Sequence, residues 1–139
     1  MKVHLVLRSS AEYTVAILEW LRPQIRDCEI VLVTDIPYFE IPSPGLTVIH
    51  MRDKWPGWWA KMNLFNPYLI DGDVFYMDLD TVPLGLLAPF ASVGRTTFLS
   101  DFYRPENLQS SLFYVTAKDR NLIWDAWQIC GPAGTIEEY

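Results

Sequence analysis

The chain has 139 residues, half of them apolar, so it can bury one core and we expect a single domain over residues 1–139. Seventeen acidic and eleven basic side chains give a net charge of −6, and no cluster of lysine and arginine stands out, so we expect no nucleic-acid partner. No apolar run reaches the roughly 18 residues that span a bilayer, and the N-terminus is too short for a signal peptide. We therefore expect no transmembrane segment and a cytoplasmic location.

The first half of the chain alternates apolar runs with one helical pattern. A β-rich run at residues 3–8 leads into a helical pattern at 11–21, and Pro23 ends that helix. Continuous apolar runs at 30–35 and 46–51 are typical of strands buried in a parallel sheet. This half therefore predicts three strands and one helix.

The second half continues the alternation. We expect a helix over residues 58–69 and a fourth strand over 73–80, followed by strands at 97–100 and 111–117 and a helix at 118–128. Strands that alternate with helices predict an α/β fold. Its sheet should be open, Rossmann-like and mostly parallel, with helices on both faces.

Polar residues end three of the predicted strands. Open α/β sheets bind ligands in the crevice at the carboxyl ends of their strands. The polar strand ends are Arg8-Ser9-Ser10, Thr34-Asp35 and Asp78-Leu79-Asp80. We therefore expect the ligand site at this edge of the sheet.

Two neighbouring carboxylates follow the fourth strand. On a strand, Asp78 and Asp80 would point to the same side while Leu79 faces the other way. Unpaired, they would repel each other and lose hydration, whereas Mg²⁺ or Mn²⁺ removes both costs and keeps positions open for phosphate oxygens. The pair therefore favours a metal site for a phosphorylated ligand. The alternative is a turn cap before Pro83 and a surface ion pair, because DxD alone is a weak signal.

Residues 54–90 contain four linked features in a fixed order. They are a helical stretch with a lysine (Ala60–Phe65, with Lys61), an apolar strand ending in DxD (Phe75–Asp80), a small turn (Thr81–Pro83) and an LxxLF-like segment (Leu86–Phe90). This segment resembles the donor-binding core of GT-A fold glycosyltransferases. The likeness is greatest to the glycogenin-like family 8 group and to similar short bacterial and phage-borne proteins.

The resemblance implies a GT-A fold and a glycosyltransferase, specifically a hexosyltransferase. The donor would be a nucleotide diphosphate sugar, most often a UDP sugar, and the acceptor is unknown. Asp78 and Asp80 would hold Mn²⁺ or Mg²⁺ against the departing diphosphate, with Lys61 as a second cation. Ordinary solvation is the alternative for Lys61. The family 8 likeness favours retention of the anomeric configuration.

The resemblance also implies further donor contacts outside the DxD segment. Base and ribose would meet the loop with Ser9, Ser10 and Tyr13, where the alternative for Tyr13 is packing on the next strand. The remaining predicted contacts are Asp35, Leu79, Asp101, Ser110 and Ser111. A turn cap is the alternative for Asp101. Gln109 and Ser111 depart from the Asn-Ser-Gly of the family, and WPGWW, residues 55–59, either stacks on a sugar or packs over the sheet.

The C-terminal part departs from the family. No histidine follows His50, although these enzymes often take a further metal ligand from a C-terminal histidine. Either water replaces this ligand, or the chain is a truncated domain with weak or no catalysis, as the shorter length suggests. A truncated domain exposes an edge that could pair with a second copy, giving a homo-oligomer.

Two other functions remain open. One is a catalytically impaired fragment that binds nucleotide sugars. The other is a haloacid-dehalogenase-like phosphatase with Asp78 as nucleophile and Asp80 as acid/base, because MDLDTVPLG fits its first motif. That motif normally lies on the first strand of its domain, whereas here three strands precede it.

Overall fold

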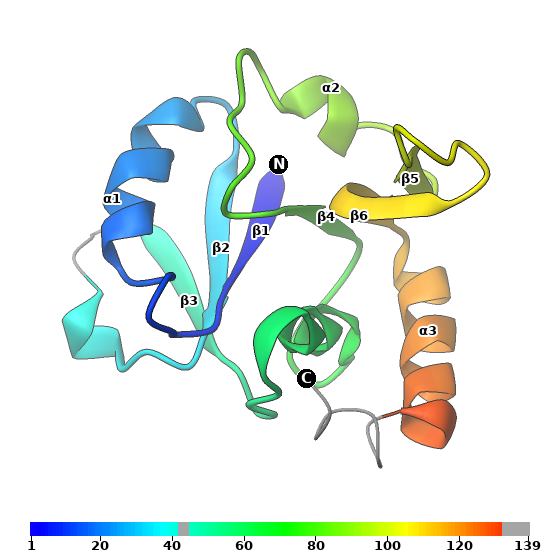
Figure 1. Cartoon of the computed structure of the whole chain (residues 1–139), viewed down its shortest axis with the longest axis horizontal. Helices are drawn as coiled ribbons and strands as arrows, with labels where there is room; N and C mark the ends of the chain where they lie inside the picture. The colour runs from blue at the N-terminus through cyan, green and yellow to red at the C-terminus, as the bar shows by residue number, and fades with distance from the viewer. Residues whose placement is uncertain (42–44, 132–139) are drawn as a thin grey trace.

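A computed structural model describes residues 1–41 and 45–131 and contains one six-stranded sheet (Figure 1). The strands are β1 (Lys2–Leu7), β2 (Glu29–Thr34), β3 (Leu46–His50), β4 (Val74–Met77), β5 (Thr97–Ser100) and β6 (Leu108–Val115). The α-helices are α1 (Ala16–Leu21), α2 (Ala88–Ala91) and α3 (Ala117–Cys130), and the 3₁₀ helices are η1 (Arg22–Gln24), η2 (Tyr38–Glu40) and η3 (Gly57–Phe65).

The sheet has the strand order β3-β2-β1-β4-β6-β5. The pairs β3·β2, β2·β1 and β1·β4 are parallel, whereas β6 runs antiparallel to both β4 and β5. The expected mostly parallel α/β sheet is therefore confirmed. The chain builds outward from β1 to β3 on one side and then returns to place β4 on the other side of β1. This reversal of strand order opens the crevice in which such sheets bind ligands.

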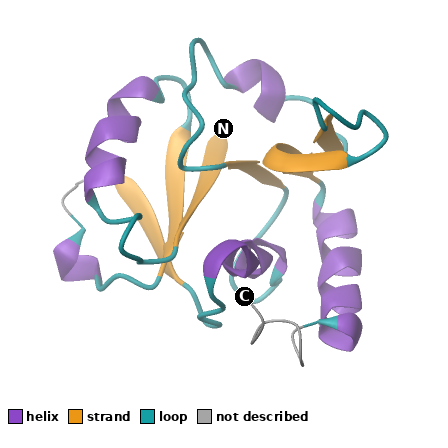
Figure 2. Ribbon diagram, in the orientation of Figure 1, coloured by secondary structure: helices purple, strands orange, loops and turns teal. Residues whose placement is uncertain are grey.

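Helices cover both faces of the sheet, as the sequence predicts (Figure 2). On one face, Leu5 of β1 packs in a buried cluster with Leu18 and Leu21 of α1. On the other face, the buried cluster includes Leu64 of η3 and Trp124 of α3. Each fully buried side chain of this size contributes about 1.5–3 kcal/mol to folding. Within the described residues, no helix is long and apolar enough to cross a membrane.

Alternation along β4 explains where its side chains point. Phe75 and Met77 belong to the cluster on the α1 face, whereas Val74 and Tyr76 belong to the cluster on the η3 face. Side chains two residues apart on a strand share a face. Asp78 follows in the register of Tyr76, so its carboxylate emerges beside the Tyr76 ring.

Several predicted elements have different bounds in the structure, among them the sixth strand, which was expected at 111–117 and spans Leu108–Val115. The first helix begins at Ala16, because Tyr13 and Ser10 form a turn in which the Ser10 hydroxyl accepts the Tyr13 N–H at 3.0 Å. The predicted strand 73–80 ends at Met77, because the chain turns there and the Thr81 N–H donates to the carbonyl of Asp78 at 3.1 Å. These changes leave the order of elements unaltered.

The largest difference concerns the helix predicted over 58–69. The chain forms the 3₁₀ helix η3, which ends before Asn66. Asn66 has an extended backbone because the following Pro67 disfavours the helical conformation. Within η3, the Asn63 side-chain amide donates to the carbonyl of Ala60 at 2.9 Å and to that of Asp53 at 2.8 Å. These bonds anchor η3 to the preceding loop, with Lys61 directed toward the sheet edge.

Candidate active site

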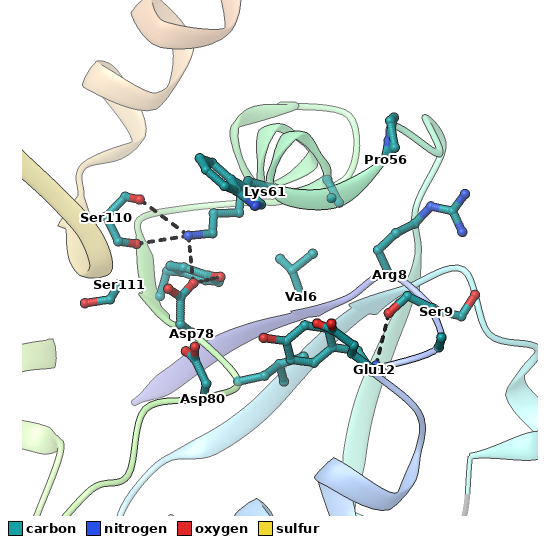
Figure 3. Close-up of a pocket in the computed structure, with 18 of the residues that line it drawn as sticks. Val6, Arg8, Ser9, Glu12, Pro56, Lys61, Asp78, Asp80, Ser110 and Ser111 are labelled. Atoms are coloured by element: carbon teal, nitrogen blue, oxygen red, sulfur yellow. Dashed lines mark hydrogen bonds and ion pairs between the residues drawn. The ribbon is translucent and has the colours of Figure 1, made fainter. Parts of the chain in front are cut away.

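An open pocket of about 790 Å³ lies where the carboxyl ends of β1 and β4 meet the start of β6 and η3 (Figure 3). Its volume falls within the roughly 300–1,000 Å³ of small-molecule sites. It is placed at the reversal of strand order between β1 and β4. The sequence-predicted residues that line it are Ser9, Ser10, Tyr13, Lys61, Asp78, Leu79, Asp80, Ser110 and Ser111.

Asp78 and Asp80 both line this pocket, although Asp80 lies in a turn rather than on the strand. The Asp78 N–H donates to the carbonyl of Ser111 at 2.8 Å, which fixes the start of the turn against β6. The carboxylate of Asp80 is exposed and has no hydrogen-bond or ion-pair partner within residues 1–41 and 45–131. The pair therefore reaches the same pocket by a turn, not by strand alternation.

One oxygen of Asp78 already has two donors. Asp78 Oδ1 lies 2.7 Å from Lys61 Nζ and also accepts the Tyr76 hydroxyl. Burial first, and then the negative charge of Asp78, raise the pKa of Tyr76 far above its ordinary value, so this hydroxyl keeps its proton and donates. Among the described residues, Asp78 Oδ2 has no partner. It is the oxygen left for a ligand.

Lys61 has three kinds of neighbour. In addition to Asp78, its ammonium lies 3.4 Å from both the carbonyl and the hydroxyl of Ser110, and 5.2 Å from the centre of the Tyr76 ring. Figure 3 shows the Lys61 and Asp78 side chains pointing toward one another across the pocket wall. The resemblance implied that Lys61 contacts the donor diphosphate or sugar; in the structure Lys61 pairs with Asp78, and its contact with a donor stays a prediction.

The charges in the pocket are mainly negative. Glu12, Asp78 and Asp80 line it, against Lys61 and Arg8. Burial, followed by the charges of Asp80, Glu12 and Asp78, raises the pKa of the Tyr13 phenol. The lining thus has one more acidic than basic side chain, and one of its acidic groups, Asp78, is paired with Lys61.

The two carboxylates fit a divalent cation. Asp78 Oδ2 and both oxygens of Asp80 are hard oxygen donors without partners among the described residues. No group of three or more histidine, cysteine, aspartate or glutamate side chains that could hold a metal occurs in the described part of the chain. Mg²⁺ commonly binds through one or two carboxylates, with water and substrate phosphates as its other ligands. The residues present therefore suit a cation that a phosphorylated ligand helps to hold.

Asp35 lies outside the pocket lining and holds the neighbouring loop instead. Its carboxylate accepts the Ser9 N–H at 2.8 Å, the Ser9 hydroxyl at 2.6 Å and a guanidinium N–H of Arg8. Burial would raise the pKa of Asp35, but the Ser9 hydrogen bonds and the Arg8 charge hold it below its usual value. Asp35 thus fixes Arg8 and Ser9 from outside the pocket lining, and its predicted contact with a donor stays untested.

Asp101 also lies outside the pocket lining. Its Oδ1 accepts the backbone N–H groups of Tyr103 at 2.8 Å and Arg104 at 2.9 Å. Its own N–H donates to the carbonyl of Asn107. These bonds make Asp101 the cap of the turn between β5 and β6, which is the alternative that the sequence left open.

Sequence reasoning missed Tyr76 as a residue of this site. Its position inside an apolar strand marks it as a core residue, and it is 2% exposed. The available signal was its spacing, because a tyrosine two residues before Asp78 shares its face of the strand. The tryptophan segment divides in two: Trp55 and Trp59 pack on Trp127 at centroid distances of 5.4 and 5.1 Å, whereas Trp58 is 79% exposed and lines the pocket.

Comparison with known proteins identifies the fold. No protein-family model matches the sequence. No curated protein sequence matches it either. The structure is similar to the crystal structure of the apo-form glycosyltransferase GlyE from Streptococcus pneumoniae TIGR4, with a TM-score of 0.60 and 13% sequence identity. The similarity covers 92% of this chain and 38% of GlyE. The chain thus shares the fold of part of GlyE and spans well under half the length of this structural neighbour.

Proposed function

We propose that this chain binds a nucleotide diphosphate sugar, specifically a UDP sugar, in the pocket between β1 and β4 and transfers its sugar to an acceptor. The observation that supports this most is the meeting of two strand ends in one pocket: the Arg8–Tyr13 loop of β1 and the Asp78–Asp80 turn of β4. A nucleoside diphosphate has a nucleoside that could contact the Arg8–Tyr13 loop and a diphosphate that could contact the Asp78–Asp80 turn. The fold-level similarity to GlyE adds support by analogy.

Each end of the pocket suits one part of the donor. Tyr13 offers an aromatic face for the base, and Ser9 and Ser10 offer hydroxyls for ribose. Ser110 and Ser111 lie across the pocket on β6. We assign them to the sugar, because hydroxyl groups recognise sugar hydroxyls through hydrogen bonds.

Transfer builds negative charge on the departing diphosphate. A divalent cation held by Asp78 and Asp80 would stabilise that charge as a Lewis acid when bound. Lys61, which lies beside Asp78, supplies a second positive charge from the protein itself. As a compact cation on a flexible stem, it can approach a phosphate oxygen without a fixed geometry.

A second candidate is donor binding without transfer. The structural similarity covers 38% of GlyE, so groups that act on an acceptor in a full-length transferase need not all be matched in this chain. The phosphatase alternative gains no such support. Asp78 follows the fourth strand of the chain, and the chain shares the fold of part of a glycosyltransferase.

Calorimetric titration with UDP, with and without Mn²⁺, tests the proposal. We expect Mn²⁺-dependent binding that Asp80→Asn weakens at least about tenfold, because one cation ligand loses its charge. Asp125→Asn is the matched control, since Asp125 is exposed on α3 and does not line the pocket. Binding that ignores the metal and survives Asp80→Asn would contradict the metal site. Tight Mn²⁺-dependent binding without donor hydrolysis or transfer would favour the second candidate.

A further inference from the structure

An internal ion pair occupies part of the predicted metal site. Lys61 Nζ lies 2.7 Å from Asp78 Oδ1, and the two side chains are only 21% and 24% exposed. Partial burial strengthens the attraction between these charges relative to a pair in open solvent. Asp78, one of the two DxD carboxylates, therefore already has a counterion within the chain.

Tyr76 holds both partners of this ion pair. Its hydroxyl donates to the same Asp78 Oδ1, and its ring face lies 5.2 Å from Lys61 Nζ. The ring itself is fixed, because it is 2% exposed and packs on Phe113 at a centroid distance of 4.9 Å. One rigid side chain thus aligns the carboxylate and keeps the ammonium beside it.

The ion pair and a divalent cation make opposing demands on Asp78. Lys61 already neutralises the charge that a cation would use, and two positive centres beside one carboxylate repel each other. A donor diphosphate changes this balance, because its oxygens offer the ammonium a more highly charged partner than Asp78. Lys61 is suited to such an exchange, since its other polar contacts, both to Ser110, are long at 3.4 Å.

We propose that Lys61 is the resident counterion of Asp78 and passes to the donor diphosphate when the nucleotide binds, which makes the divalent cation and the nucleotide bind with positive coupling. Tyr76 acts as the positioning residue of this exchange. The inference rests on the proposed donor-binding function and adds to it an order of events: without nucleotide, the Lys61 charge weakens the binding of the cation to Asp78. The coupling is reciprocal: if bound nucleotide raises the affinity for the cation by some factor, then bound cation raises the affinity for the nucleotide by the same factor.

Lys61→Met tests this exchange, because it keeps the aliphatic stem and removes the charge. Mn²⁺ binding is measured by the electron paramagnetic resonance signal of the free ion, first alone and then with saturating UDP. We expect Lys61→Met to bind Mn²⁺ alone about five- to tenfold more tightly than wild type, and to bind UDP with Mn²⁺ less tightly. The factor by which UDP strengthens Mn²⁺ binding should fall accordingly. A residue with a merely structural role would not move these two affinities in opposite directions.

Lys118→Met is the matched control, because Lys118 is exposed on α3 and its loss changes the net charge equally. It should behave as wild type in both titrations. Equal Mn²⁺ affinities of wild type and Lys61→Met without UDP, or no Mn²⁺ binding to either, would overturn the exchange. Failure of the proposed function looks different: UDP would bind neither protein, while the titration with Mn²⁺ alone would still report on Lys61.

Discussion

Asp35 holds Ser9 in place through two bonds, one to its backbone N–H at 2.8 Å and one to its hydroxyl at 2.6 Å. The two residues lie 26 positions apart in the sequence and follow neighbouring parallel strands. Because Arg8 pairs with the same carboxylate, Asp35 fixes the beginning of the loop that lines the pocket. The loop that we propose to bind the nucleoside therefore depends on a residue outside the pocket wall.

Asp35→Ala should lower both the stability of the chain and its affinity for UDP. The free energy of unfolding should fall by about 1–3 kcal/mol, because Ser9 and Arg8 lose a partly buried acceptor. Urea denaturation and calorimetric titration measure the two effects. Asp35→Ser, with a short acceptor, should recover part of the stability. An unchanged UDP affinity in a destabilised Asp35→Ala protein would show that Asp35 does not shape the site.

Acidification should destabilise the chain through Asp73. The Tyr114 hydroxyl, followed by the N–H of Ala117 and the charge of Arg120, lowers the pKa of Asp73 against the opposing effect of burial. A carboxyl whose folded-state pKa is lowered stabilises the fold above its unfolded pKa of about 4 and loses this contribution as the pH falls through the folded value. Unfolding measured between pH 6 and pH 3 should therefore show a smaller acid-induced loss for Asp73→Asn than for wild type. Equal losses would contradict this assignment.

Substitution of Tyr13 tests the proposed binding of the nucleoside base. Tyr13→Ala should weaken UDP binding by about tenfold, because stacking of a base on an aromatic ring contributes roughly 1–3 kcal/mol. Tyr13→Phe keeps the ring and should retain most of the affinity in the same titration. Tyr68→Ala is the matched control, since Tyr68 is 83% exposed and does not line the pocket. Equal affinities of Tyr13→Ala and wild type would remove Tyr13 from the donor site.

The tryptophans of the second core cluster should contribute to stability. Trp127 is 9% exposed and contacts the rings of Trp55 and Trp59. Trp127→Ala should reduce the free energy of unfolding by about 3–5 kcal/mol, because it leaves a cavity between η3 and α3. Denaturant titration checks this value. A loss below about 1 kcal/mol would mean that the cluster does not hold η3, and with it Lys61, against the sheet.

Sequence patterns predicted the sheet well, because its strands are short apolar runs between polar turns. The strand expected at 97–100 is observed as Thr97–Ser100, and both helix-covered faces were anticipated. The bounds of η3 were not predicted. They depend on the bonds of Asn63 to Asp53 and on the restriction that Pro67 imposes, and hydrophobic periodicity records neither.

The candidate site was predicted where it depends on sequence-local motifs. Asp78, Asp80 and Lys61 belong to one segment whose order resembles a known family, and all three line the pocket. Asp35 acts through its hydrogen bonds to Ser9, which join the ends of two strands. Tyr76 acts through its hydroxyl, which lies at the end of a buried ring and donates to Asp78. The Asp35 contact leaves no pattern that differs from an ordinary strand end, and the only sequence signal for Tyr76 is its spacing two residues before Asp78.

The most direct test of the account is a crystal structure of the chain with UDP and Mn²⁺, with the metal located by its anomalous scattering. The account predicts an anomalous peak within coordination distance of the Asp78 and Asp80 carboxylates, with the diphosphate on the same ion and the base beside Tyr13. A Mn²⁺ ion bound elsewhere, or a nucleotide that leaves the pocket between β1 and β4 empty, would contradict it.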